Sequence, residues 1–478
     1  MSGLGNRSTS RPGRPAWPFL AALMATVVVL AGACTSPRTP TPAGPVTAAA
    51  STGPAKAMVP PDTSAGAQLG WLIAAAAHLP VSGEQVQAHF DAAFLTQADA
   101  AAINQTLQPV AGVKLLSIEV SDLNTVAAIV SASGALSQAQ VWLTVDSQGL
   151  ISRLRISPVT TGPGPATWAD VDTALRSVAP QVRLLVAGVS NGSCRPVHSI
   201  DPGTAAPLGA AFKLYVLDAL GNAVASGRVR WNQPLTVTAQ LTSLPGGQAQ
   251  NEPYGTRISV LDTAAAMISL SANTATDMLI NLVGRSAVET ALTTTGMADP
   301  ALDRPFLTTR EIFVLKLDQW PALAKRYIAA DEPGRRALLT SVVDRAPLPG
   351  VAAAQAWTTP RDINSLEYFA SANDICRAYA SLAALTRRPG LSPIGEVLSL
   401  NDDGLALDPA QWKTTWFKGG SEPGVLTLTY LATTRTGHSY IVTVLAEDPS
   451  QPIDETIAVP VMLSAIKGAF TLAARQDS

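Results

Sequence analysis

Strand-like segments stand at both ends of the last two thirds of this sequence, with a long, mostly helical stretch between them. Residues 182–189 are dominated by Val and Leu and, together with residues 196–200, predict two strands. Residues 430–448 predict a hairpin, and residues 455–474 predict a long helix with an apolar face. This order of elements favours an α+β chain in which an antiparallel sheet is flanked by helices.

The residues before that stretch follow a different pattern, in which helical spacing gives way to alternation. Helices followed by a strand meander predict a small α+β domain over residues 67–157. A larger domain would follow over residues 168–475, and two or three domains suit a chain of 478 residues. The helices are expected over residues 68–79, from Ser82 to Phe94, and from a cap at Thr96 to Leu107; the strands are expected over residues 113–120, 125–133, 139–147 and 150–157.

The start of the chain carries the features of an export signal. Basic residues within residues 1–17 precede an uncharged, apolar run over residues 18–33. Small residues then lead into Cys34, and this junction resembles the lipobox of bacterial lipoproteins, whose cysteine is lipidated. The resemblance implies a signal peptide over residues 1–33 and a lipid anchor at the extracytoplasmic face of the cell membrane. Two alternatives stay open: a secreted protein with an incidental cysteine, and a retained transmembrane helix, for which the run is short.

A proline-rich segment follows the cysteine. Residues 34–66 contain seven prolines among Thr, Ser, Ala and Gly. This composition does not build a hydrophobic core, and it predicts an extended tether that holds the folded domains away from the membrane.

Charge and cysteine content exclude several classes of partner. A formal net charge of -2 and an aromatic content of 5% give no basis for binding nucleic acid. The four histidines and three cysteines form no clustered ligand pattern, so we expect no metal site. We also expect no cofactor. With Cys34 lipidated, Cys194 and Cys376 remain as an even pair in an oxidising compartment. We expect either a disulfide or two small buried side chains.

Three short motifs occur in the larger domain. They are A-A-F-K at residues 210–213, S-A-N at residues 271–273, and K-G-G at residues 418–420, followed by Ser421. In this order and context they resemble the S-x-x-K, S-D-N and K-T-G motifs of serine β-lactamases and penicillin-binding proteins. The resemblance implies the β-lactamase/transpeptidase-like fold. The long interval between the second and third motifs predicts an insertion around residues 300–365, including a turn that begins at Asp331.

The N-terminal domain also resembles a known one. Residues 89–107 are similar to the small, steroid-isomerase-like domain that precedes the hydrolase domain in β-lactamase-like proteins of clavulanic-acid gene clusters. This resemblance implies an actinobacterial-type lipoprotein. A structural or docking role is expected for the domain, because its sequence shows no obvious acid/base pair.

The resemblance to the β-lactamases implies a role for each motif residue. Ala210 stands where the family has its nucleophilic serine, and Lys213 stands where it has the activating lysine. Ser271 and Asn273 take the places of the proton-relaying hydroxyl and its neighbour, and are expected to hold Lys213. The alternative for each motif is helix-cap or turn chemistry, and for Lys213 a lysine that snorkels at a helix end. The substrate-binding positions are Lys418, Gly419, Gly420 and Ser421.

The first motif lacks the atom that the family's chemistry needs. Acyl transfer requires an oxygen nucleophile, and the alanine at position 210 has none. The backbone N–H groups of Ala210 and Ser421, expected to act as oxyanion donors, do not depend on that side chain. No E-x-x-L-N stretch supplies a deacylating glutamate, since Glu311, Glu332 and Glu367 stand in other contexts. We expect a natural substitution, because the chain keeps its signal peptide and shows no tag; a laboratory variant is the alternative.

These observations predict an exported lipoprotein that binds a carboxylate-bearing small molecule or peptide, such as a β-lactam or a cell-wall peptide, without catalysis. One alternative is a weak hydrolase of β-lactams or esters that uses Ser271 or water, with Lys213 as the base. Another is an envelope scaffold whose working surface is the N-terminal domain. The sequence determines neither the ligand nor the oligomeric state.

Overall fold

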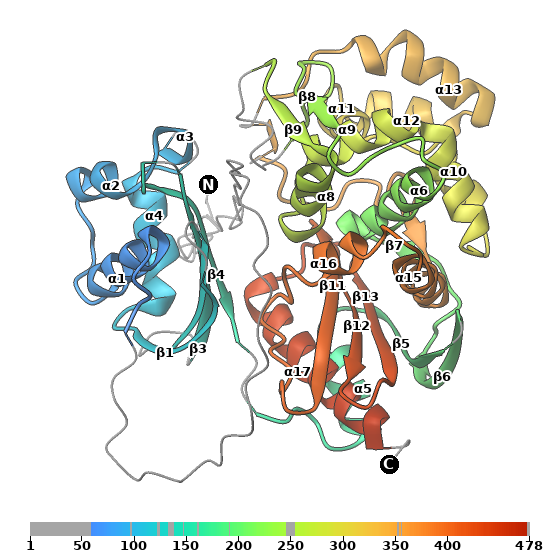
Figure 1. Cartoon of the computed structure of the whole chain (residues 1–478). Helices are drawn as coiled ribbons and strands as arrows, with labels where there is room; N and C mark the ends of the chain where they lie inside the picture. Colours follow the sequence, from blue (N-terminus) through green and yellow to red (C-terminus); the bar gives the residue numbers. More distant parts are fainter. Residues whose placement is uncertain are drawn as a thin grey trace, which may run out of the picture.

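The computed structural model describes residues 59–475, except residues 96–97, 122–124, 132–137, 147, 160–161, 191, 245–253, 351–352 and 355. The predicted signal peptide, Cys34 and most of the predicted tether lie outside the described residues. Within the described range the chain forms a small unit followed by a larger one (Figure 1).

The small unit packs helices against one face of a four-stranded antiparallel meander in the order β1-β2-β3-β4. Leu69 and Leu72 of the first helix meet Val126, Leu143 and Ile151 of the sheet in its core. The helices are α1 (Ser64–Ala76), α2 (Gly83–His89), α3 (Ala92–Leu95) and α4 (Ala100–Leu107); the strands are β1 (Lys114–Ser121), β2 (Thr125–Ser131), β3 (Gln138–Val145) and β4 (Ile151–Pro158).

One helix predicted in this unit is interrupted. A capping box at Ser82 confirms its predicted start. The single helix expected up to Phe94 is wrong, because Phe90 is extended and forms a parallel bridge with Ile151 of β4. The helix α3 then begins at Ala92, and the Asp91 carboxylate caps its first turn by accepting a hydrogen bond from the backbone N–H of Phe94. Pairing with the sheet therefore breaks the helix here. Thr96 lies outside the described residues, and Asp99 caps α4.

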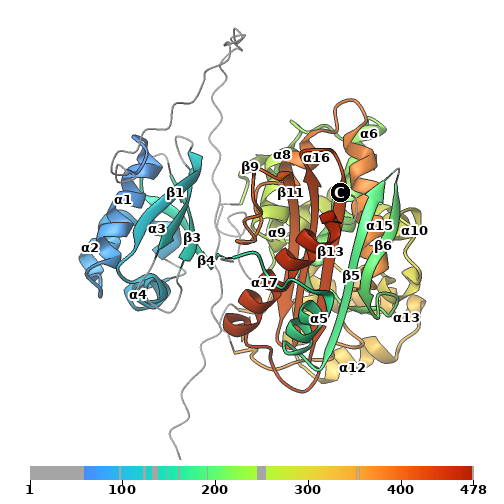
Figure 2. The same cartoon turned by 90° about the horizontal axis from the view of Figure 1, so that it is seen from below.

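The larger unit is built on a five-stranded antiparallel sheet in the order β11-β12-β13-β5-β6. Strands β5 and β6 come from the start of the unit, and strands β11, β12 and β13 come from its end. Strand β5 pairs along its length with β13. Two helices, α5 and α17, cover one face, and the helical block covers the other (Figures 1 and 2). The elements are α5 (Trp168–Arg176), β5 (Gln181–Ser190), β6 (Ser193–Ile200), β11 (Trp412–Glu422), β12 (Val425–Thr434), β13 (Ser439–Glu447) and α17 (Glu455–Ala474).

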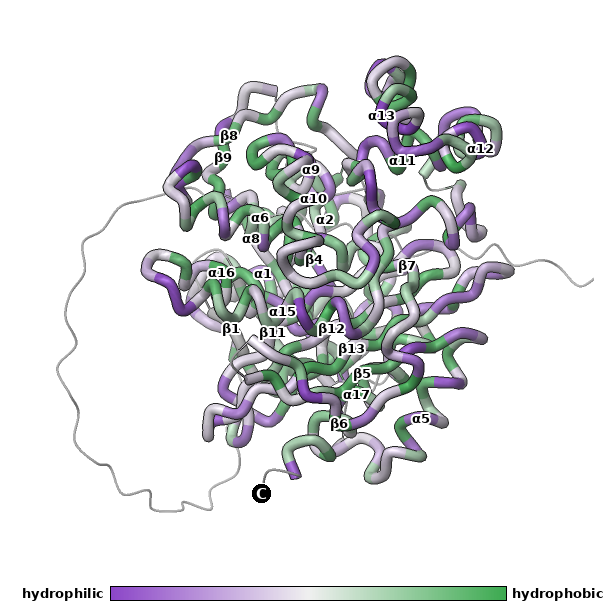
Figure 3. The backbone as a smooth tube through the Cα atoms, turned by 90° about the vertical axis from the view of Figure 1, so that its right-hand side faces the viewer, coloured by the Kyte–Doolittle hydropathy of each residue, from purple (hydrophilic) through white to green (hydrophobic). Residues whose placement is uncertain are grey.

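The helical block surrounds α6 (Lys213–Ala225), whose residues are buried on nearly every side. Hydrophobic stretches run along the strands of the sheet, and hydrophilic ones are prominent on the peripheral helices α12 and α13 (Figure 3). The predicted antiparallel sheet flanked by helices is confirmed. The remaining elements are β7 (Ala206–Pro207), η2 (Gly209–Phe212), β8 (Pro234–Thr236), β9 (Arg257–Ser259), α8 (Val260–Ser269), α9 (Asn273–Val283), α10 (Arg285–Thr294), η3 (Pro300–Asp303), α11 (Thr309–Leu317), α12 (Ala322–Ala329), α13 (Glu332–Ser341), η4 (Val343–Arg345), β10 (Phe369–Ala370), α15 (Ala372–Thr386) and α16 (Pro393–Leu398).

The C-terminal helix α17 is apolar over most of its length. By length and composition, it is the one helix within the described residues that could cross a membrane. Half of its most apolar segment, Ile457–Ala474, is buried inside the protein. There, residues such as Met462, Ile466 and Phe470 pack against the sheet. This packing is that of a core helix.

A disulfide joins Cys194 on β6 to Cys376 on α15. It connects residues separated by 182 positions, and it ties the edge of the sheet to the helical block. Closing so long a loop restricts the unfolded chain strongly. We expect reduction to lower the free energy of unfolding by about 2–5 kcal/mol.

The measurement is urea unfolding with and without dithiothreitol. The shift should persist in a Cys34→Ser variant and disappear in a Cys194→Ser variant, which lacks the bond already. An identical unfolding midpoint for the oxidised and the reduced protein would contradict the prediction.

Candidate functional site

The amine of Lys213 lies at the centre of the predicted site. Lys213 begins α6 and is fully buried. Its Nζ donates hydrogen bonds to the carbonyl oxygen of Ser271 (2.6 Å), to Oδ1 of Asn273 (2.7 Å) and to Oγ of Ser271 (3.2 Å). The lysine is therefore held by the second motif and does not extend into solvent from a helix end.

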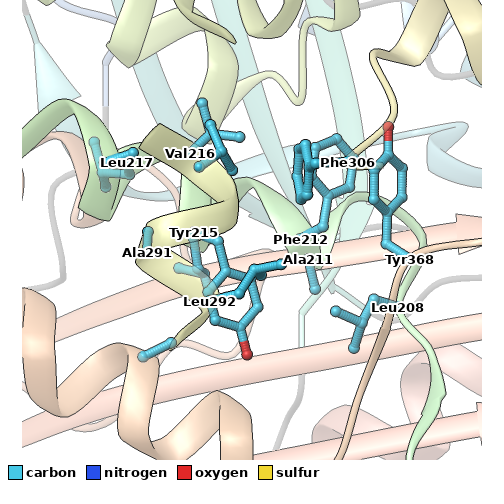
Figure 4. Close-up of a cluster of buried hydrophobic side chains, with 14 of the residues drawn as sticks. Leu208, Ala211, Phe212, Tyr215, Val216, Leu217, Ala291, Leu292, Phe306 and Tyr368 are labelled. Atoms are coloured by element: carbon cyan, nitrogen blue, oxygen red, sulfur yellow. The ribbon is translucent and has the colours of Figure 1, made fainter. Parts of the chain in front are cut away.

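Buried aromatic rings fix the start of this helix. The ring of Phe212, the residue before Lys213, stacks on that of Tyr368 at 3.6 Å and meets Phe306 edge-on (Figure 4). The Tyr368 hydroxyl donates to the carbonyl oxygen of Leu307. Because the neighbouring side chain is locked in the core, the direction of the Lys213 side chain is set by packing.

Ser271 occupies a strained turn between α8 and α9. Its φ is 56°, in the left-handed region that few residues other than glycine adopt. The turn is held by the bond from the backbone N–H of Ala272 to the Ala266 carbonyl, and by the Asn273 amide, which donates to the Leu244 carbonyl. Strained backbone of this kind is often found at functional sites.

Lys418 approaches the same hydroxyl from β11. Its Nζ lies 3.0 Å from Oγ of Ser271 and 2.6 Å from the carbonyl oxygen of Gly419, and its side chain is almost fully buried. The Ser271 hydroxyl therefore lies between two lysine amines that come from different elements.

Burial changes the proton affinity of both amines. Burial, with a further contribution from the nearby Lys418 charge, lowers the pKa of Lys213 well below its ordinary value. Burial and, to a smaller extent, the positive charge of Arg155 on β4 together lower the pKa of Lys418 to about 7. Amines of this kind are suited to two kinds of chemistry: in the neutral form they accept a proton, and in the charged form they bind an anion.

Glycine lets β11 approach η2 closely enough for backbone contact. A Cβ on Gly420 would lie 2.3 Å from the backbone nitrogen of Ala210. A Cβ on Gly209, whose φ is 50°, would lie 2.8 Å from the backbone nitrogen of Ser421. Only residues without a side chain fit such an approach. It brings the backbone N–H groups of Ala210 and Ser421 into one neighbourhood, as the motifs predict.

The glutamates considered from the sequence are engaged elsewhere. Glu311 forms an ion pair with Arg285 at 2.6 Å. Glu332 pairs with Arg336 at the surface, and Glu367 lies 3.6 Å from Lys316. Among the described residues, none of these carboxylates hydrogen-bonds to Lys213 or Ser271. No group of three or more His, Cys, Asp or Glu in that part of the chain could hold a metal ion.

A buried charge cluster lies behind the end of β11, and the sequence did not reveal it. Lys316 of α11 is fully buried and forms ion pairs with Glu422 of β11 and with Glu367. Its amine also lies 5.2 Å from the centre of the Trp357 ring. Glu422 directly follows Ser421, so the cluster fixes the position of the strand that carries the third motif.

Comparisons with known proteins gave matches among the solved structures. Similar solved structures include a β-lactamase from Sphaerobacter thermophilus (17% identity, 63% of this chain and 97% of that chain, TM-score 0.44) and PBP-A (15% identity, 66% and 100%, TM-score 0.44). A β-lactamase from Francisella tularensis is also similar (13% identity, 64% and 98%, TM-score 0.44). A search of curated proteins gave no match.

Two family models match the sequence itself. Residues 60–151 match the N-terminal domain of the ORF 12 gene product. Residues 169–378, which contain the first two motifs, match the β-lactamase enzyme family. The larger unit of this chain therefore contains a β-lactamase family domain, matched over residues 169–378.

Proposed function

We propose that this chain is an exported lipoprotein whose β-lactamase family domain binds a carboxylate-bearing ligand without forming a covalent bond to it. A cell-wall peptide or a β-lactam is the expected ligand, and the N-terminal unit is a steroid-isomerase-like domain of the type found beside clavulanic-acid gene clusters. The observation that carries the proposal is the pairing of an alanine at position 210 with an otherwise assembled set of polar groups around Ser271. The export and anchoring rest on the apolar run and Cys34.

The arrangement suits recognition of a carboxylate. A charged Lys418 and the Ser271 hydroxyl offer adjacent donors, and charge-assisted hydrogen bonds of this kind are stronger than neutral ones. The backbone N–H groups of Ala210 and Ser421 offer further donors for a carbonyl oxygen. Gly419 supplies no hydroxyl at the middle of the third motif, so the carboxylate depends on Lys418 and Ser271.

The second candidate function is slow hydrolysis with Ser271 as the nucleophile. It is favoured by the hydrogen bond between Lys213 and the Ser271 hydroxyl, and by burial, which lowers the pKa of Lys213 and so favours the neutral amine that can act as a base. Hydrolysis through this hydroxyl would be abolished by Lys213→Ala. Equal turnover by wild type and this variant would exclude it.

A fluorescent penicillin separates the two functions. The proposed binder should raise the anisotropy of the probe at equilibrium, and unlabelled penicillin should compete. No fluorescence should remain on the wild-type protein after denaturation. A label that survives denaturation would contradict binding without covalent capture.

The affinity for the probe should fall as the pH rises above about 7. The charged amine is the form of Lys418 that attracts a carboxylate, and its pKa of about 7 means that binding at higher pH requires uptake of a proton. We expect the Kd to rise about tenfold per pH unit between about pH 7 and 9. Lys418→Gln should weaken binding and flatten this profile. Lys413→Gln, which changes an exposed lysine on the same strand, should leave it unchanged. A flat profile for the wild-type protein would count against Lys418 as the anion ligand.

A further inference from the structure

The N-terminal domain contacts the larger domain next to the site. Arg155 of β4 forms an ion pair with Asp403, which lies in the loop between α16 and β11. The side chains of Arg155 and Asp403 are 10% and 23% exposed, so neither charge is fully solvated. Removing one partner of such a pair leaves the other charge poorly compensated. The contact therefore favours one fixed position of this loop against β4.

The loop, residues 401–406, has a backbone that its own side chains hold in shape. The Asp402 carboxylate accepts hydrogen bonds from the backbone N–H groups of Gly404 (3.0 Å) and Ala406 (2.9 Å). The Asn401 side chain accepts one from the backbone N–H of Asp403 (2.8 Å). Asp403 and Ala406 have φ values of 54° and 46°, in the left-handed region. Strain of this kind persists only where surrounding contacts enforce it.

The same loop reaches the turn that carries Ser271. The Asn401 amide donates a hydrogen bond to the carbonyl oxygen of Ser269, at 3.1 Å. Ser269 ends α8, and the strained Ser271 follows two residues later. A continuous series of contacts thus leads from Arg155 through the 401–406 loop to the hydroxyl between the two lysines.

We propose that Arg155 is a positioning residue for the ligand site: by holding the 401–406 loop through Asp403, the N-terminal domain fixes the turn that presents Ser271. The inference rests on the proposed function for its ligand. It assigns the N-terminal domain a working role in the same site and makes the two domains one functional unit.

Arg155 also has an electrostatic effect that a purely structural contact would not have. Its positive charge lowers the pKa of Lys418, beyond the larger effect of burial. Removing that charge should therefore raise the pKa of Lys418. The titratable and charged groups that surround this region are Lys213 of α6, Arg155 of β4, Asp402 and Asp403 of the loop, Asp277 of α9, Tyr379 of α15, Tyr430 of β12 and Lys467 of α17.

The first readout needs no ligand. The titration of Lys418 would be followed by nuclear magnetic resonance of its side-chain nitrogen in the full chain, with Lys418→Gln used for assignment. Arg155→Gln should shift the Lys418 midpoint upward, and Arg155→Lys, which keeps the charge, should shift it less. Asp403→Asn removes the carboxylate and keeps the cation, so it should not raise the midpoint. Lys114→Gln, which removes an exposed cation of the same domain, is the control.

The second readout is the Kd for fluorescent penicillin at about pH 6, where Lys418 is mostly charged in the wild type and in both variants, so that its altered pKa has little effect on binding. Arg155→Gln and Asp403→Asn should each weaken binding about 5- to 10-fold, since both release the loop. If Arg155→Gln changes neither the titration midpoint of Lys418 nor the Kd, the inference is overturned. It is also overturned if Arg155→Gln and Asp403→Asn raise the Lys418 midpoint equally. If no variant, including wild type, binds the probe, the proposed function fails, while the titration still decides the inference.

Discussion

An Ala210→Ser variant is expected to form a stable covalent adduct with penicillin, at a rate at least about a thousandfold above that of wild type. The new hydroxyl would lie one helical turn before Lys213, and burial lowers the pKa of that amine, which favours the neutral form that can accept the hydroxyl proton. The backbone N–H groups of Ala210 and Ser421 would stabilise the developing oxyanion. The rest of the site is already assembled, so one oxygen atom changes its chemistry.

The adduct should persist, because hydrolysis of the acyl group needs a second base. Glu311 and Glu367 are committed to ion pairs with Arg285 and Lys316. Intact-mass spectrometry after incubation with penicillin would detect one added acyl group that remains for hours.

A matched control for this variant is Ala211→Ser, which places a hydroxyl on the neighbouring residue, whose side chain faces the buried core. It should show no adduct. If the Ala210→Ser protein also stays unmodified while it binds the probe reversibly, the oxyanion donors or Lys213 are not positioned for acyl transfer.

Replacing Lys316 with methionine is expected to lower the free energy of unfolding by about 3–5 kcal/mol. Lys316 is the cation that faces both Glu422 and Glu367, and all three side chains are less than a tenth exposed. Burial already raises the pKa of Glu422 well above its usual value, and Lys316 counteracts part of that rise. Without the amine, two carboxylates remain in a low-dielectric environment, where they either stay charged at a cost or take up protons.

Chemical unfolding at pH 8 would measure this loss. Lys325→Met, which removes an exposed lysine on the adjacent α12, should have little effect. Adding Glu422→Gln to Lys316→Met should recover part of the loss, because it removes one of the two uncompensated charges. Equal stability of Lys316→Met and wild type would show that the carboxylates do not depend on Lys316.

The elements at the two ends of the larger domain could be predicted because their patterns are local. Short apolar runs rich in Val and Leu mark β5, β12 and β13, and a long apolar face marks α17. The break at Phe90 could not be predicted, since it arises from a bridge to Ile151 that lies far away in sequence. The turn expected at Asp331 is wrong for a similar reason: Asp331 caps α13, with Pro333 in its first turn, and the same residues are compatible with either structure.

The site could be predicted as far as its motifs extend. The proximity of Lys213, Ser271 and Lys418 could be predicted because each residue stands in a short motif that resembles a motif of the serine β-lactamases. Arg155 and Lys316 belong to no such pattern. Their roles follow from contacts with Asp403 and Glu422 that only the folded chain creates.

The pairing of the first and last strands of the larger domain also determines when that domain can fold. Arg183 on β5 forms an ion pair with Glu447 on β13, which follows 264 residues later in the chain. During synthesis the ribosome therefore releases β5 and β6 long before the strand that completes their sheet. The nascent domain carries an open apolar edge until almost its last residues have emerged, a state prone to aggregation. A polypeptide truncated before β13 would lack the strand that joins β5 to β12, so the sheet of its larger unit could not form.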